Sequence, residues 1–132
     1  MFHHCYNLTG ISFEACTSIG EVAFAYCSSL QTVYAPSCIY ISANAFISCS
    51  RLSSVDMPVC ISVWRYAFTS CSNLSYISFP ACTSIGDSAF ANCTSLTQAI
   101  FPSCQYVNGF YGCSSLSIIS FPECISIGSR AF

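Results

Sequence analysis

The sequence predicts a solenoid, a fold in which one short structural unit repeats along a single axis. Two cysteine series share a period of 22 residues, shortened once by two: Cys5, Cys27, Cys49, Cys71, Cys93, Cys113 and Cys16, Cys38, Cys60, Cys82, Cys104, Cys124. A leucine follows each member of the first series by three residues, and a phenylalanine closes every row: Phe24, Phe46, Phe68, Phe90, Phe110 and Phe132. A period in the twenties that holds over six rows is typical of stacked coils that bury a common core.

The consensus row reads C-x-x-L-x-x-I-x-F-P-x-C-x-x-I-G-x-x-A-F-x-x. The fifth row is two residues shorter, because QYVNGF stands where other rows have a segment such as TSIGDSAF. The length of 132 residues suits one domain. We therefore predict a single array over residues 1–132, with repeats at approximately 5–26, 27–48, 49–70, 71–92, 93–112 and 113–132.

The first half of each row is predicted to be a β-strand. Apolar residues alternate in Ile77-Ser78-Phe79 and in Ile119-Ser120-Phe121, which places isoleucine and phenylalanine on one side. A proline, which cannot donate to a strand ladder, follows in five of the six rows. We expect these strands to stack as one parallel sheet, with the apolar side chains in the core.

The second half of each row predicts a second short extended segment followed by a turn. The x-x-I-G segment suits an extended piece that ends at glycine, although Ser42, Trp64 and Asn108 replace that glycine in three rows. The x-x-A-F segment supplies two more buried anchors, which we expect on a single turn of 3₁₀ or α helix. The cysteine spacing of 11 residues is also a helical supercoil period, but five prolines and many β-branched residues disfavour long helices.

Three roles are open to the twelve cysteines. In stacked strands, equivalent residues lie about 4.8 Å apart, so each series forms a column. Buried thiols that pack between coils are the favoured interpretation. Disulfides within a column would be strained, because a relaxed bridge needs a shorter Cβ separation. Metal binding has little support, since there is no CxxC motif and the two histidines, His3 and His4, sit together in a variable loop position.

Composition excludes several functional classes. The chain is 54% hydrophobic and 6% charged, has a formal charge of −2 and contains no lysine. It therefore lacks a basic surface for nucleic acid. Its apolar runs are too short to span a membrane, and its first residues do not resemble a signal peptide. We expect a chain that either is not exported by this route or is a piece of a longer protein.

Catalysis has no support in the sequence. The five acidic residues never occupy the same repeat position in adjacent rows, so stacking assembles no carboxylate pair. There is no Gly-x-Ser-x-Gly motif and no glycine-rich phosphate loop. We predict that the protein is not an enzyme, and we assign no catalytic, cofactor-binding or metal-binding residues.

The repeat resembles a known family. L-x-x-I-x-F-P-x-C-x-x-I is similar to the leucine-rich-repeat pattern, and I-G-x-x-A-F-x-x-C-x-x-L resembles the BspA-like, or Treponema-type, subfamily over all six rows. The resemblance implies a curved right-handed solenoid with a parallel sheet on its concave face. It also implies an extracellular or cell-surface location and a role in adhesion, with no catalysis through the repeats. The second cysteine of each row departs from many BspA-like repeats.

The expected concave face is neutral and rich in hydroxyl groups, a composition suited to a protein or glycan ligand. Its predicted binding residues are Thr32, Tyr34, Ser54, Asp56, Tyr76, Ser78, Gln98, Ile100, Ile118 and Ser120. The alternative interpretation is that this face is an ordinary solvent-exposed strand surface that binds no partner.

The two ends of the array predict a second kind of contact. Neither end shows a polar cap, and uncapped coils expose core side chains and strand edges. We expect an end-to-end contact through Phe2, Cys5, Leu8, Ile127 and Phe132. Two hypotheses follow: a non-catalytic interaction or adhesion module of a BspA-like surface protein, and a structural protein that self-assembles into filaments by head-to-tail stacking.

Overall fold

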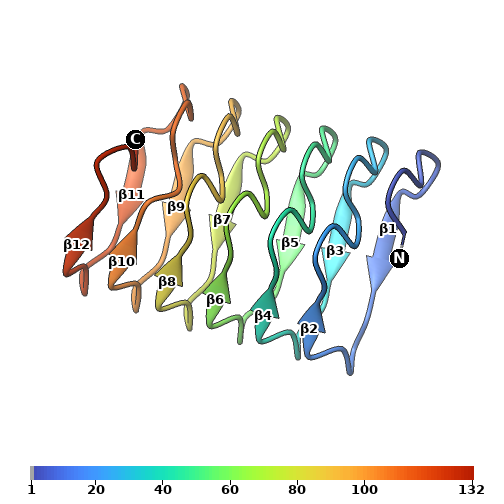
Figure 1. Ribbon diagram of the computed structural model, residues 1–132, viewed down its shortest axis with the longest axis horizontal. Coiled ribbons are helices and arrows are strands. Elements are labelled where there is room, and N and C mark those ends of the chain that lie inside the picture. The colour runs from blue at the N-terminus through green and yellow to red at the C-terminus, as the bar shows by residue number, and fades with distance from the viewer. Residues whose placement is uncertain (1) are drawn as a thin grey trace.

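Six coils stack in a row in the computed structural model, which describes residues 2–132 (Figure 1). The two ends of the chain lie at opposite ends of the row. Every regular element in the described residues is a short β-strand. Consequently none of these residues belongs to a helix that could cross a lipid bilayer.

Each complete coil contributes two strands, and all pairings are parallel. The first strands of the coils are β1 (Gly10–Ser12), β3 (Thr32–Tyr34), β5 (Ser54–Asp56), β7 (Tyr76–Ser78), β9 (Gln98–Ile100) and β11 (Ile118–Ser120). The second strands are β2 (Ser18–Ile19), β4 (Tyr40–Ile41), β6 (Ser62–Val63), β8 (Ser84–Ile85), β10 (Tyr106–Val107) and β12 (Ser126–Ile127). Residues at equivalent repeat positions pair directly, as in Ile19 with Ile41, which confirms the predicted solenoid and its two extended segments.

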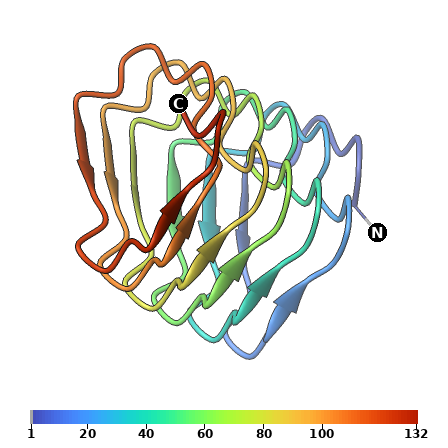
Figure 2. The ribbon, with the colours of Figure 1, turned by 60° about the vertical axis from the view of Figure 1, so that its left-hand side comes forward.

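The two sheets differ in continuity. The even-numbered strands form one six-stranded sheet in the order β12-β10-β8-β6-β4-β2 (Figure 2). The odd-numbered strands form two three-stranded sheets, β1-β3-β5 and β11-β9-β7, so the single sheet expected on this side is divided between the third and fourth coils. The third and fourth coils remain stacked, although β5 and β7 do not pair as strands.

The x-x-A-F segment forms successive turns, and no 3₁₀ or α-helical turn is present there in the described residues. Two columns of non-glycine residues in these turns have a positive φ angle. One comprises Val22, Asn44, Tyr66 and Ser88, and the other comprises His4, Tyr26, Ser48, Ser70 and Asn92, with φ between 50° and 61°. Left-handed residues at this frequency interrupt any helix, because helical φ is negative.

These turns are hydrogen-bonded from coil to coil. The Phe24 amide donates to the Ala45 carbonyl at 2.8 Å, and the Phe68 amide donates to the Ala89 carbonyl at 2.7 Å. The shortened fifth row keeps the pattern, since the Phe90 amide donates to the Gly109 carbonyl at 2.7 Å. The backbone of the turns is thus paired much as the strands are, which satisfies its polar groups.

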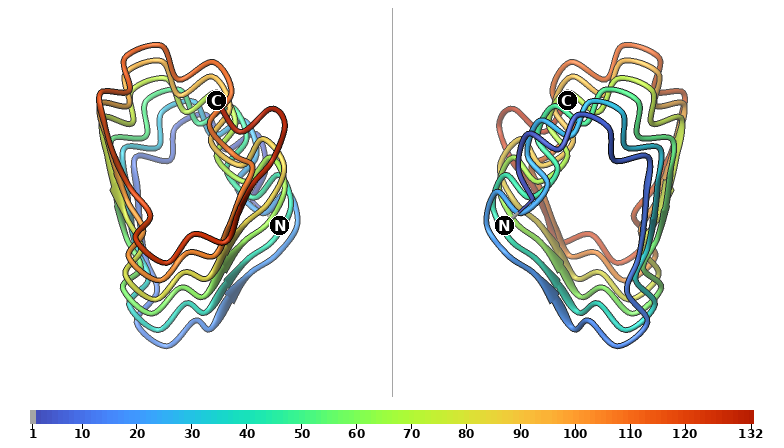
Figure 3. Two further views of the ribbon diagram at one scale, coloured as in Figure 1. Left: turned by 90° about the vertical axis from the view of Figure 1, so that its left-hand side faces the viewer. Right: turned by 90° about the vertical axis from the view of Figure 1, so that its right-hand side faces the viewer.

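The core is built from columns of identical side chains, because the coils superpose along the axis (Figure 3). The rings of Phe46, Phe68, Phe90 and Phe110 stack with successive centroid distances of 5.1, 5.2 and 5.1 Å. Phe79 and Phe101, which directly follow β7 and β9, pack against this column. The predicted assignment of both phenylalanine series to the core is confirmed for the interior coils.

Candidate interaction surfaces

The predicted binding face lies on the outer side of the odd-numbered strands. The middle residue of an interior strand is buried or half-buried, and its neighbours face outward. Six of the predicted residues are exposed: Thr32, Tyr34, Ser54, Asp56, Tyr76 and Ile118. Ser78, Gln98, Ile100 and Ser120 are half-buried, so these four predicted residues are less accessible to a partner.

This face brings an acid next to a tyrosine. Tyr34 pairs in register with Asp56, so their side chains leave adjacent strands on the same side. Tyr76 is half exposed on β7, across the interruption of the sheet. Asp56 is the one charged residue among the outward positions of the odd-numbered strands, so the face offers mainly hydroxyl and aromatic contacts.

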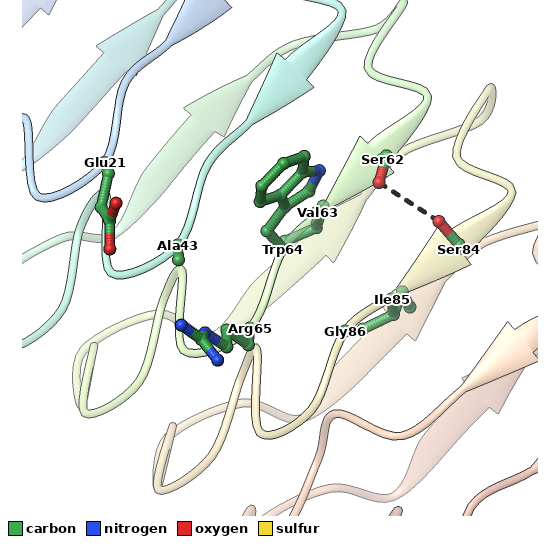
Figure 4. Close-up of a pocket in the computed structure, with 9 residues that line it drawn as sticks. All are labelled: Glu21, Ala43, Ser62, Val63, Trp64, Arg65, Ser84, Ile85 and Gly86. Atoms are coloured by element: carbon green, nitrogen blue, oxygen red, sulfur yellow. Dashed lines mark hydrogen bonds between the residues drawn. The ribbon is translucent and has the colours of Figure 1, made fainter.

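A second surface, not predicted from the sequence, is a pocket over the six-stranded sheet (Figure 4). Its volume is about 440 Å³, and residues of the first four coils line it: Glu21, Ala43, Ser62, Val63, Trp64, Arg65, Ser84, Ile85 and Gly86. Trp64 is the only tryptophan of the chain and is 54% exposed. The available signal was its repeat position, which glycine, serine or asparagine fills in the other rows.

The backbone holds Trp64 firmly although its ring is exposed. The Trp64 amide donates to the Ile41 carbonyl at 2.9 Å, and the Gly86 amide donates to the Val63 carbonyl at 2.8 Å. A Cβ atom on Gly86 would lie 2.6 Å from the Arg65 nitrogen, so only glycine lets the fourth coil approach this closely. The indole therefore projects from a fixed base.

The ends of the array expose side chains that are buried in the interior coils. Phe2 is 53% exposed, Phe132 is 54% exposed and Ile127 is 59% exposed, whereas Cys5 and Leu8 are half-buried. An apolar hollow of about 290 Å³ lies between Phe2 and Phe13 at the N-terminal end. Met1, which the repeat pattern places at the alanine position before the closing phenylalanine, lies outside the described residues.

All twelve cysteines are free thiols, and those of the interior coils are buried. In the first series, each thiol from Cys27 onward donates to the phenylalanine carbonyl of an earlier coil, as in Cys49 Sγ to Phe24 O at 3.1 Å. In the second series, each thiol donates to the carbonyl two residues ahead, as in Cys82 Sγ to Ser84 O at 3.3 Å. The columns thus satisfy backbone carbonyls at the bends.

Burial disfavours ionisation of two interior thiols, Cys49 and Cys60. Removal from water disfavours the thiolate and raises the pKa of both Cys49 and Cys60 to about 12. Thiolates, which are the nucleophiles and metal ligands, are therefore scarce at these two positions at neutral pH. A hydrogen bond with the neighbouring cysteine instead lowers the pKa of Cys104 and Cys113. Within residues 2–132, no three histidine, cysteine, aspartate or glutamate side chains converge in a way that could hold a metal ion.

Comparison with protein families decides the assignment. The model of the "BspA type leucine rich repeat region (6 copies)" matches residues 1–109 and 106–132, which together cover the whole chain. The chain belongs to the BspA-type leucine-rich-repeat family. Proteins of this family generally act as repeat modules for protein interaction and not as catalysts. Among curated proteins, no relative matches the chain.

Solved structures show the same fold. A leucine-rich-repeat protein of T. pallidum has a TM-score of 0.70 at 20% identity, over 91% of this chain and 71% of that one. One from Bacteroides ovatus has a TM-score of 0.58 at 22% identity, over 91% of this chain and 41% of that one. A leucine-rich cell surface protein of Faecalibacterium prausnitzii has a TM-score of 0.53 at 26% identity, over 99% of this chain and 52% of that one. This BspA-type array thus spans about half or less of the latter two proteins.

Proposed function

We propose that this BspA-type array is a non-catalytic adhesion module of a cell-surface protein, and that it binds a partner protein through the outer face of the odd-numbered strands. The observation that carries the proposal is the hydroxyl-rich face around Tyr34 and Tyr76, whose single charged residue is Asp56. Tyrosine supplies a large contact area at a low cost in conformational entropy, and serine supplies adaptable hydrogen bonds. The description of the F. prausnitzii structure as a cell surface protein supports the location.

A binding measurement with paired variants tests this proposal. Fibronectin, laminin and collagen are immobilised, and the purified chain is passed over each surface by surface plasmon resonance. If Tyr34 and Tyr76 are central contacts, Tyr34→Ala and Tyr76→Ala each weaken binding by about tenfold or more. Tyr106→Ala is the matched control, because Tyr106 is equally exposed on the other sheet. Equal loss in the control variant, or no binding to any of the three proteins, contradicts the proposal.

A second candidate function is filament formation by head-to-tail stacking of the 132-residue chain. It is supported by the exposure of core positions at both ends, which places Phe2, Leu8 and Phe132 at apolar edges. A contact between opposite ends of two copies is heterologous and does not close, so it propagates. In a longer protein, further coils would cover these same edges.

Negative-stain electron microscopy of the purified chain tests the filament. We expect linear particles that grow with concentration, and we expect Phe132→Asp to convert them to monomers, because a carboxylate at the contact would be buried without a partner. Tyr40→Asp is a control on an exposed aromatic residue of the interior strand β4. Isolated particles of the unmodified chain at high concentration would exclude this function.

A further inference from the structure

The pocket around Trp64 combines one aromatic platform with two opposite charges. Only eight of the 132 residues are charged, and two of them, Glu21 and Arg65, line this pocket together with the single tryptophan. The acid and the base are one each, so the lining carries no net charge. A ligand with a single charge would be attracted by one of these two side chains and repelled by the other. The lining therefore favours a ligand without net charge.

The polar groups of the pocket are largely free to bind a ligand. Within residues 2–132, the only side-chain hydrogen bond between lining residues joins Ser62 Oγ and Ser84 Oγ, which lie 3.2 Å apart. The serine pair lies to one side of the indole and Glu21 to the other (Figure 4). The carboxylate accepts hydrogen bonds, the guanidinium donates them and the hydroxyl groups do both. The ideal ligand consequently presents several hydroxyl groups on both sides of one flat apolar patch.

We infer that this pocket is a binding site for a neutral saccharide. The C–H groups on one face of a sugar ring carry partial positive charge and pack on the electron-rich face of the indole. The hydroxyl groups at the edge of the ring pair with Glu21, Arg65 and the serines, and hydrogen bonds to charged groups are the stronger ones. The volume of about 440 Å³ lies within the range of small-molecule sites and accommodates more than one sugar unit.

The pocket lies on the continuous one of the two sides of the solenoid. Its base is the six-stranded sheet, whose strands pair without interruption from β2 to β12. The residues at the repeat position of Trp64 in adjacent coils are small, with Ser42 in the second coil and Gly86 in the fourth, and the indole is 54% exposed. The inferred site lies on a different sheet from the protein-binding face proposed above, and either can exist without the other.

Tryptophan fluorescence, excited selectively over tyrosine, tests the inference directly, because the only tryptophan of the chain lies in the pocket. The probes are neutral tetrasaccharides of glucose, galactose, mannose and N-acetylglucosamine, and the ionic controls are tetramethylammonium and acetate. We expect at least one tetrasaccharide to change the emission in a saturable manner and the two ions to leave it unchanged. No change with any tetrasaccharide up to its solubility limit, or a stronger response to either ion, overturns the inference.

Calorimetry with variants locates the binding. Trp64→Ala should weaken the saccharide by about tenfold or more, whereas Trp64→Phe should retain most of the affinity because it keeps an aromatic face. Tyr106→Ala, on the same sheet but outside the pocket, should bind as the unmodified chain does. Equal losses in Trp64→Ala and Tyr106→Ala overturn the inference. If Trp64→Ala loses saccharide binding but still binds the matrix proteins, the saccharide site and the proposed adhesion face are independent.

Discussion

Phe68 and Phe132 occupy the same position of the repeat, yet Phe68 is fully buried and Phe132 is 54% exposed. The same contrast separates Ile85 from Ile127 and Phe24 from Phe2. A side chain in a solenoid is buried by the coils before and after it, since its own coil covers only part of it. Interior and terminal coils therefore share one sequence pattern, but the same side chain contributes more to the free energy of unfolding in an interior coil.

The largest expected difference concerns the phenylalanine column. Phe68→Ala removes a ring that stacks on both Phe46 and Phe90, and should lower the free energy of unfolding by about 3–5 kcal/mol. Phe132→Ala removes a ring with one stacked neighbour, Phe110, and should cost less than half as much. Urea denaturation followed by circular dichroism measures both values. Equal losses would show that the coils do not bury one another in the way described.

Alkaline pH should destabilise the protein through its buried cysteine columns. Burial raises the pKa of Cys49 and Cys60 from the ordinary value of 9.0 to about 12. Between these values the unfolded chain loses thiol protons that the folded chain keeps, so stability is full below pH 9 and falls as the pH rises toward 12. Urea titrations at a series of pH values measure this slope. A Cys49→Ala, Cys60→Ala double variant should show a smaller slope, and an unchanged slope would assign the effect elsewhere.

Two glycines at one repeat position sharpen the comparison. A Cβ atom on Gly86 would lie 2.6 Å from the Arg65 nitrogen and 2.9 Å from the Trp64 carbonyl carbon, whereas one on Gly20 would meet nothing within 4 Å. Gly86→Ala should therefore destabilise by about 1–3 kcal/mol through forced backbone shifts. Gly20→Ala should be neutral or stabilising by up to about 1 kcal/mol, because alanine restricts the unfolded chain. Thermal unfolding of the two variants measures this difference, and an equal fall in Tm for both variants would contradict the prediction.

The smallest expected effect comes from the left-handed turn column. Val22 in the first coil has φ of 50°, and Asn44 occupies the equivalent place in the second coil with φ of 57°. Valine is poorly suited to this region and asparagine tolerates it, so Val22→Asn should stabilise by about 0.5–1 kcal/mol. The reverse change, Asn44→Val, should destabilise by a similar amount. Shifts of the same sign in the two urea midpoints would show that backbone strain does not govern this column.

Prediction from the sequence succeeded where the period carried the information. Because Phe46, Phe68 and Phe90 are each 22 residues apart, one alignment of the rows assigned the column, the strands and the core. The outward residues of the odd-numbered strands followed from the alternation in the same rows. Their role in binding stays a prediction that the experiments above address.

Prediction was incomplete where local backbone geometry decided the outcome. The turn columns carry mostly residues other than glycine at left-handed positions, and glycine occurs there only at Gly112, so a helical turn was a reasonable expectation. The interruption between β5 and β7 has no counterpart in the repeat pattern, since both rows keep their apolar alternation.

The sequence by itself determined the number of coils, the register of the strands and the identity of the core columns, because a strict repeat forces equivalent residues to stack. Only the tertiary structure decided where the sheet of odd-numbered strands is interrupted, since the rows on both sides of the break keep the same apolar alternation. It alone also assembled the pocket at Trp64. Glu21, Trp64 and Ser84 come from different coils and converge only when the coils are stacked.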